Sequence, residues 1–254
     1  MRTLLAMTLL AASTQAAAQH HHHAAPATPS PPTTPVPALT DADREAAKRP
    51  EQQHAVHDNK VHTFVLFNRL EASDRGGLAW ESRAWAGTDT DRLWLRSEGE
   101  RVDERTHASD LEVMYGRPVS PWWELLVGVR HDFKPGASQD WGAIGIVGTA
   151  PYKIHLEATA YVGPSGRTAA RIEAEYDVLL TNRLVLQPLV ELDAYGKDDR
   201  ARGVDAGATL EAGLRLRYEV HRQFAPYVGV EHEAALGGGG QSETRVVAGV
   251  RVWF

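Results

Sequence analysis

The chain has 254 residues, of which 43% are hydrophobic, and its formal net charge is −6 at pH 7. This acidic balance argues against nucleic acid as a partner, because proteins that bind nucleic acids carry clustered basic residues. The chain contains no cysteine, which excludes disulfide bonds, thiolate metal ligands and cysteine catalysis.

The first expected element is a secretory signal peptide at residues 1–18. Arg2 precedes an apolar block from Leu4 to Ala18, and the run Ala16–Ala18 supplies small residues for cleavage before Gln19. The block is shorter than the roughly 20 residues that a membrane-spanning helix needs. The segment therefore predicts an exported protein.

Residues 19–60 differ in composition, and we expect them to form a disordered periplasmic arm rich in histidine and proline. Four consecutive histidines, His20 to His23, open the arm, and prolines recur between positions 26 and 37. Such a proline-rich stretch forms neither a regular helix nor a sheet. A short helix is expected over residues 41–48, with Thr40 as its N-terminal cap.

Residues 61–254 alternate between apolar and polar side chains, which predicts β-strands. In the last segment, Val250 and Phe254 share one face while Arg245 and Arg251 lie on the other. Each run is near the 9–11 residues of a tilted membrane strand, and ten strands would also fit, since pattern boundaries are uncertain by a few residues. Twelve runs are expected, at 61–71, 77–87, 91–101, 107–117, 122–132, 139–149, 153–162, 168–179, 184–195, 205–218, 225–235 and 243–254.

This pattern predicts an all-β fold, a closed antiparallel transmembrane β-barrel of about 12 strands in the outer membrane, with both termini on the periplasmic side. A soluble sandwich or a lipocalin-like barrel also alternates, but charges of both signs on one face favour a lumen filled by paired ions. An acidic path for cations is the alternative interpretation. The inward-facing charged residues are expected to include Arg69, Glu81, Arg83, Arg96, Glu98, Glu112, Glu124, Arg130, Glu173, Glu191, Glu211, Arg215, Glu231 and Arg251.

Several longer motifs of the presumed barrel are specific to one family. They are Asp91–Glu100, Tyr115–Trp123, Val129–Phe133, Tyr176–Pro188, Tyr195–Asp199 and Phe224–Val230. In these motifs the chain resembles the copper resistance protein B family over about residues 55–254. The resemblance implies an outer-membrane protein of copper resistance operons with a metal-binding N-terminal segment.

The chain departs from this family in its methionine content. The N-terminal region of the family is commonly rich in methionine as well as histidine, whereas methionine occurs here only at positions 1, 7 and 114. A copper site in the arm would therefore use imidazole ligands, which suit Cu(II) better than Cu(I) and also bind zinc or nickel.

The candidate metal ligands are mostly the histidines of the arm. His54 and His57 are three residues apart, so a helical turn would bring them to one face. The alternative for the arm is a polar tail with incidental surface histidines. Met114 and His155 are weaker candidates, because gap filling explains Met114 better and pairing with lumen charges is the default interpretation of His155. The full set is His20, His21, His22, His23, His54, His57 and His62, with Met114 and His155 in second place.

The expected function is that of an outer-membrane copper resistance protein. It would bind periplasmic copper through the histidine-rich arm and sequester or export it via the barrel. The alternative is a small outer-membrane barrel unrelated to metal, either a narrow channel or a structural protein. No Gly-x-Ser-x-Gly turn, phosphate loop or zinc-hydrolase helix occurs, and we expect no enzyme. The expected partners are copper ions, outer-membrane lipid and a periplasmic copper-handling protein.

Overall fold

The computed structural model describes residues 38–48, 60–103, 105–200, 202–236 and 242–254. The chain divides into two units, Met1–Val56 and His57–Phe254. The predicted signal peptide and the histidines at positions 20–23, 54 and 57 lie outside the described residues, and their roles stay predictions.

In the first unit, the helix α1 (Asp41–Lys48) begins at a reciprocal cap. The backbone N–H of Asp43 donates to the Thr40 hydroxyl at 3.2 Å, and the backbone N–H of Thr40 donates to the Asp43 carboxylate at 2.9 Å. These two bonds satisfy donors that a helix start leaves without partners. The helix predicted over 41–48, with Thr40 as its cap, is confirmed.

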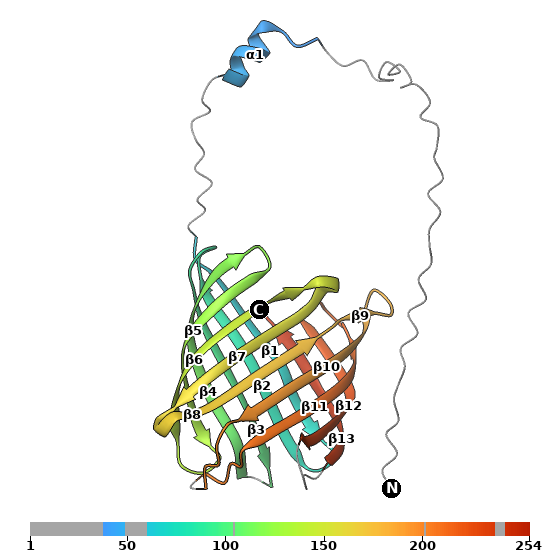
Figure 1. Ribbon diagram of the computed structural model, residues 1–254. Helices are drawn as coiled ribbons and strands as arrows, with labels where there is room; N and C mark the ends of the chain where they lie inside the picture. The colour runs from blue at the N-terminus through green and yellow to red at the C-terminus, as the bar shows by residue number, and fades with distance from the viewer. Residues whose placement is uncertain (1–37, 49–59, 104, 201, 237–241) are drawn as a thin grey trace, which may run out of the picture. The chain divides into compact units, whose positions relative to one another are not determined.

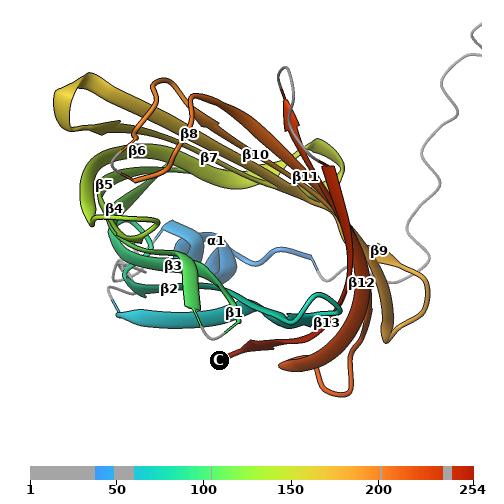
Figure 2. The same cartoon turned by 90° about the horizontal axis from the view of Figure 1, so that it is seen from below.

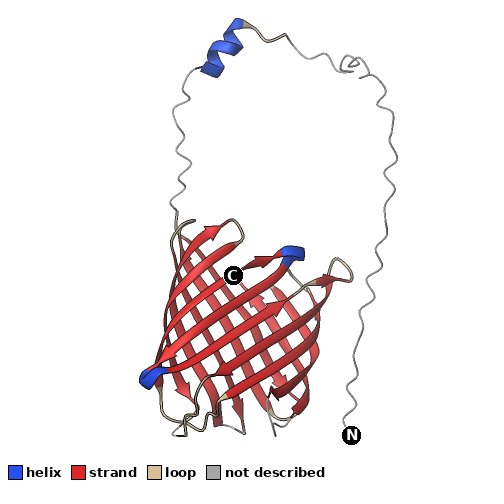
Figure 3. Cartoon of the chain, viewed as in Figure 1, coloured by secondary structure: helices blue, strands red, loops and turns tan. Residues whose placement is uncertain are grey.

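The second unit is an antiparallel β-barrel, drawn in Figures 1 and 3, in which sequential strands pair and β13 closes the sheet against β1. The strands are β1 (His62–Ser73), β2 (Gly77–Gly87), β3 (Arg92–Val102), β4 (Arg105–Ser120), β5 (Trp123–Lys134), β6 (Gln139–Ala150), β7 (Ile154–Gly163), β8 (Arg167–Glu175), β9 (Val178–Leu179), β10 (Leu184–Tyr195), β11 (Gly207–Tyr218), β12 (Phe224–Leu236) and β13 (Ser242–Trp253).

The short strand β9 continues β8, so the closed barrel has the twelve strands that the pattern predicts. Both β8 and β9 pair with β10 in one uninterrupted register. The interruption lies opposite Pro188, which has no N–H to donate; the Tyr176 N–H still donates to the Pro188 carbonyl at 3.1 Å. The predicted strand 168–179 is therefore one strand with a single missing ladder bond.

Both ends of the barrel wall meet at the same rim. Val65 and Phe254 exchange backbone hydrogen bonds of 3.1 and 2.9 Å, so β1 begins where β13 ends. We call this rim the terminal end. We call the other rim the opposite end. Among the described connections there, only the one between β10 and β11, residues 196–206, is long.

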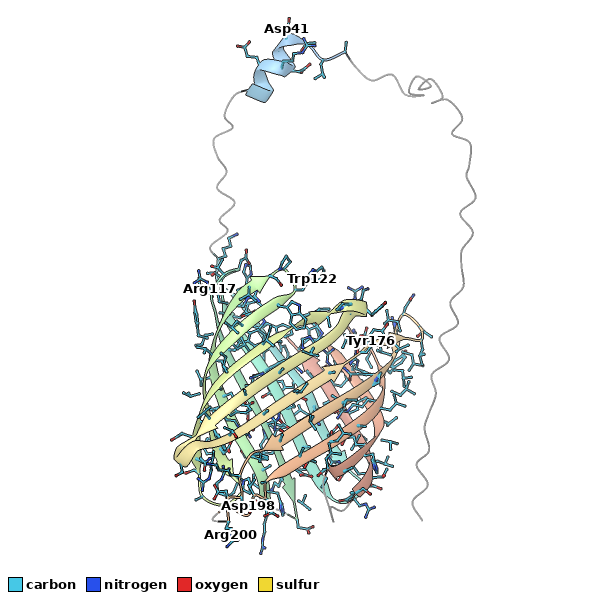
Figure 4. All side chains as sticks on the ribbon, viewed as in Figure 1. Asp41, Arg117, Trp122, Tyr176, Asp198 and Arg200 are labelled. Carbon is cyan, nitrogen blue, oxygen red and sulfur yellow. The ribbon has the colours of Figure 1, made fainter. Side chains whose placement is uncertain are left out.

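The outer surface of the barrel is apolar, as a lipid-facing surface must be. Aromatic side chains gather near the terminal end, where Figure 4 labels Trp122 and Tyr176. In the part of the chain that the structure describes, no helix has the length and apolar character needed to cross a bilayer. Exposed apolar residues of the wall include Leu93, Leu95, Val113, Leu125, Val127, Val129, Ile144, Ile172, Val190, Leu214, Val228, Val230 and Val246.

Candidate functional site

The inner wall carries a row of glutamates at directly opposed strand positions. Glu157 on β7 pairs with Glu173 on β8, Glu173 pairs with Glu191 on β10, and Glu191 pairs with Glu211 on β11. Directly opposed like charges destabilise a sheet. We call these four residues the glutamate row, and it requires compensating cations from elsewhere in the lumen.

Arginines on the facing wall supply those cations. Figure 2 shows β1, β2 and β3 across the lumen from β7, β8, β10 and β11. Arg69 on β1 contacts Glu191 at 3.2 Å and Glu211 at 3.1 Å. Arg83 on β2 contacts Glu173 at 3.4 Å and also pairs with Glu157. The ion pairs thus tie two walls of the barrel together across its interior.

A β-bulge in β1 positions Arg69. The register of β1 against β2 shifts between Phe67 and Arg69, so Asn68 is the extra residue, and both Asn68 and Arg69 are buried. A bulge places two successive side chains where one would otherwise lie. The Asn68 amide donates to Glu175 at 2.7 Å and to Glu81 at 3.1 Å, so Asn68 and Arg69 both bind the Glu81 carboxylate.

The cross-lumen ion pairs divide the interior into separate cavities. At the centre, between Arg83, Arg96, Arg171 and the carboxylates around them, the cavity has a volume of about 40 Å³. The cavity toward the terminal end has a volume of about 330 Å³, and that toward the opposite end about 260 Å³. We call the central ion pairs the plug. They confirm the expectation that paired ions fill and narrow the lumen.

The long loop 196–206 is tied to the wall at the opposite end. Arg202 is buried, and its guanidinium donates to Asp132 at 2.8 Å and to the Pro135 carbonyl at 3.2 Å. Asp199 is also buried and pairs with Arg167 of β8 at 3.1 Å. Charged side chains therefore fix this loop, although its sequence is polar and rich in turn formers.

The two weaker metal candidates, Met114 and His155, lie in the lumen beside arginines. The Met114 side chain is 1% exposed, and its sulfur lies 2.9 Å from an Arg96 guanidinium nitrogen. His155 lines the cavity at the terminal end, with Nε2 2.9 Å from Arg83 and 3.2 Å from Glu157. A neighbouring guanidinium disfavours a metal cation, so these positions support packing and charge pairing.

His62 lies exposed at the start of β1, at the terminal end of the barrel. Among the residues that the structure describes, no group of three or more histidine, cysteine, aspartate or glutamate side chains is arranged to hold a metal ion. The ligands predicted at positions 20–23, 54 and 57 lie outside this description.

Sequence reasoning found the inward charges but missed how they combine. The opposed alignment of the glutamate row follows from the strand register, which depends on the length of every turn between the strands. No periodic pattern in the sequence predicts the buried ion pairs and hydrogen bonds of the loop 196–206. Alternation alone predicts the face on which a side chain lies. It does not predict which residue that side chain pairs with.

Comparison with known proteins agrees with the fold. A family model described as copper resistance protein B precursor matches residues 61–254. The chain is 44% identical over 234 residues to copper resistance protein B of Escherichia coli, covering 87% of this chain and 79% of that protein. It is 46% identical over 234 residues to a copper resistance protein B homolog of Pseudomonas syringae pv. tomato, covering 87% and 80%.

Among solved structures, the NanC porin resembles the chain with a TM-score of 0.50 and 13% sequence identity. The match covers 75% of this chain and 99% of the porin. At this identity the likeness shows the fold alone, which is that of an outer-membrane barrel.

Proposed function

The chain belongs to the copper resistance protein B family, and we propose that its histidine-bearing arm binds copper ions on the periplasmic side while the barrel anchors the arm in the outer membrane. Membership of the family supports copper as the metal. The ligands would be His20–His23, with His54, His57 and His62 as further imidazoles. Imidazole ligands favour Cu(II), and a periplasmic copper-handling protein is the donor that we propose.

The lumen is a poorer place for copper than the arm, because its acidic side chains already pair with guanidinium groups. Arg69 alone contacts Glu81, Glu98, Glu191 and Glu211 at 2.8–3.3 Å. A metal ion entering there would have to displace these pairs and then sit close to the released arginine charge. This comparison favours the imidazoles of the arm.

The observation that carries the proposal is the ion-paired centre of the lumen. The plug leaves a central cavity of about 40 Å³, which is several times smaller than the cavities on either side of it. It therefore supports sequestration of copper at the membrane surface. Export through the barrel would require several buried ion pairs to separate first.

A copper titration of the full-length protein, reconstituted in lipid, tests the proposal. The variant H20Q/H21Q/H22Q/H23Q removes four arm histidines. A matched control removes four barrel histidines, H107Q/H131Q/H221Q/H232Q. We expect the arm variant to lose most of the bound Cu(II) and the control to keep it. Binding should also weaken between pH 7 and 5, since imidazole has an ordinary pKa of about 6.5 and binds metal only when neutral.

Equal copper binding by both variants would contradict the assignment of copper to His20–His23 and would leave His54, His57, His62 or the lumen as the site. Absence of binding in the unaltered protein would favour the alternative of a barrel whose histidines are incidental.

A further inference from the structure

The outer wall of the barrel carries an apolar groove. The groove has a volume of about 430 Å³ and crosses β7, β8 and β10 near the terminal end. This volume lies within the range of roughly 300–1,000 Å³ that is typical of ligand pockets. Its apolar lining comes from Tyr152, Ile154, Ala174, Tyr176, Pro188 and Val190.

The local backbone explains why the wall is hollow there. Pro188 cannot donate to the carbonyl of Tyr176, so β8 and β10 share one hydrogen bond at this position where a regular pair would share two. Ala174, directly opposite Val190, is the smallest side chain on the outer face of this region. A missing ladder bond and a small side chain together leave space between the two tyrosines.

The groove opens onto the lipid-facing surface. Val190 is 46% exposed, and Tyr152 and Tyr176 belong to the aromatic side chains that gather near the terminal end. Because the barrel is a transmembrane barrel, the medium that meets this surface is lipid. We propose that the groove binds one acyl chain of a phospholipid from the surrounding leaflet, with the two tyrosines on either side of the chain.

The polar group behind the groove is turned away from it. Glu175 borders both the groove and the cavity at the terminal end. Its carboxylate accepts a 2.7 Å hydrogen bond from Asn68 in the lumen, and the residue is buried. The groove therefore presents an apolar surface to its occupant, as an acyl chain requires. This inference is independent of copper binding.

Native mass spectrometry of the full-length protein tests this site. The protein is reconstituted in vesicles of palmitoyl-oleoyl phosphatidylethanolamine and then extracted into detergent. The unaltered protein should retain one phospholipid molecule after bulk lipid is removed. Ala174→Trp fills the groove and should lose most of this adduct. Ala170→Trp makes the same change on the same face of β8, outside the groove, and should keep it.

Equal retention by the two variants, or no retained lipid in the unaltered protein, would overturn the proposal. The mobility of the unheated protein on a denaturing gel reports whether each barrel is folded. If Ala174→Trp does not fold, Val190→Phe fills the groove from β10 and is expected to lose the adduct in the same way. Retention of the lipid by folded Val190→Phe would equally overturn the proposal.

Discussion

Replacing Arg69 by methionine tests most directly the role of the ion pairs that cross the lumen to the glutamate row. Methionine keeps most of the aliphatic length of the side chain and removes its charge. Arg69 is 5% exposed and forms ion pairs with four glutamates, at 2.8 Å to Glu81, 3.1 Å to Glu211, 3.2 Å to Glu191 and 3.3 Å to Glu98. The substitution leaves these carboxylates buried with fewer cations, and two of them belong to the glutamate row.

We expect Arg69→Met to lower the free energy of unfolding by about 3–5 kcal/mol, the usual cost of removing one partner of a buried ion pair. The four contacts do not add separately, because neighbouring arginines still pair with some of the same carboxylates. Arg75→Met is the matched control. Arg75 pairs with Glu243 at 3.7 Å with both side chains exposed, and its loss should cost about 0–1 kcal/mol.

Denaturant unfolding of the protein in lipid vesicles, followed by tryptophan fluorescence, measures both changes. The double variant R69M/E211Q should recover part of the stability, because it removes one of the stranded charges. In planar bilayers, Arg69→Met should also raise the conductance for cations, since Glu81 and Glu98, which line the central cavity, then lose a neighbouring positive charge. A stability loss no larger than that of Arg75→Met would refute the view that Arg69 neutralises the glutamate row.

Three further changes have defined outcomes. Pro188→Ala restores a backbone donor. It should slow hydrogen exchange at the amide of its cross-strand partner roughly two- to tenfold, the equivalent of about 0.5–1.5 kcal/mol. Unchanged exchange would show that the missing hydrogen bond does not loosen the wall. Arg202→Ala frees the loop 196–206 and should speed its cleavage by proteinase K, whereas the exposed Arg200→Ala should not. The hydrogen bonds that Thr40 donates lower the pKa of Asp43. The stabilisation of the helix start by this cap is therefore complete above the ordinary aspartate pKa, and it is lost as the pH falls through the lowered pKa of Asp43. Thr40→Val should raise this pKa in a carboxyl NMR titration, and no change would mean that the hydroxyl is not the cause.

The strands and their faces could be predicted from the sequence because a barrel wall imposes one simple rule. Each strand must present apolar side chains to lipid and polar ones to the lumen, so period two survives in residues such as Arg215, Leu216 and Arg217. The break at Pro188 also follows from chemistry visible in the sequence, since proline has no N–H. The sequence does not show the register of the strands, that is, which residues of neighbouring strands lie opposite each other.

The bulge at Asn68 shows how a shift in register changes which side chains meet. One extra residue there changes which side chains meet β2, and with it the position of Arg69 relative to the glutamates across the lumen. The pairing of Arg69 with Glu191 joins residues 122 positions apart. Such a contact depends on every intervening turn and on the tilt of the strands, which local patterns do not encode.

The composition of the plug has a physical consequence for the proposed function. A lumen filled with apolar side chains would often be as stable as one filled with ion pairs, because buried charges lose most of their Coulomb gain to desolvation. Stability alone therefore does not account for the glutamate row and its arginines. Paired charges of both signs fill the centre of the lumen, where the cavity has a volume of about 40 Å³. A barrel whose centre is filled in this way suits the proposed role, in which the barrel holds a copper-binding arm at the membrane and the arm carries the metal.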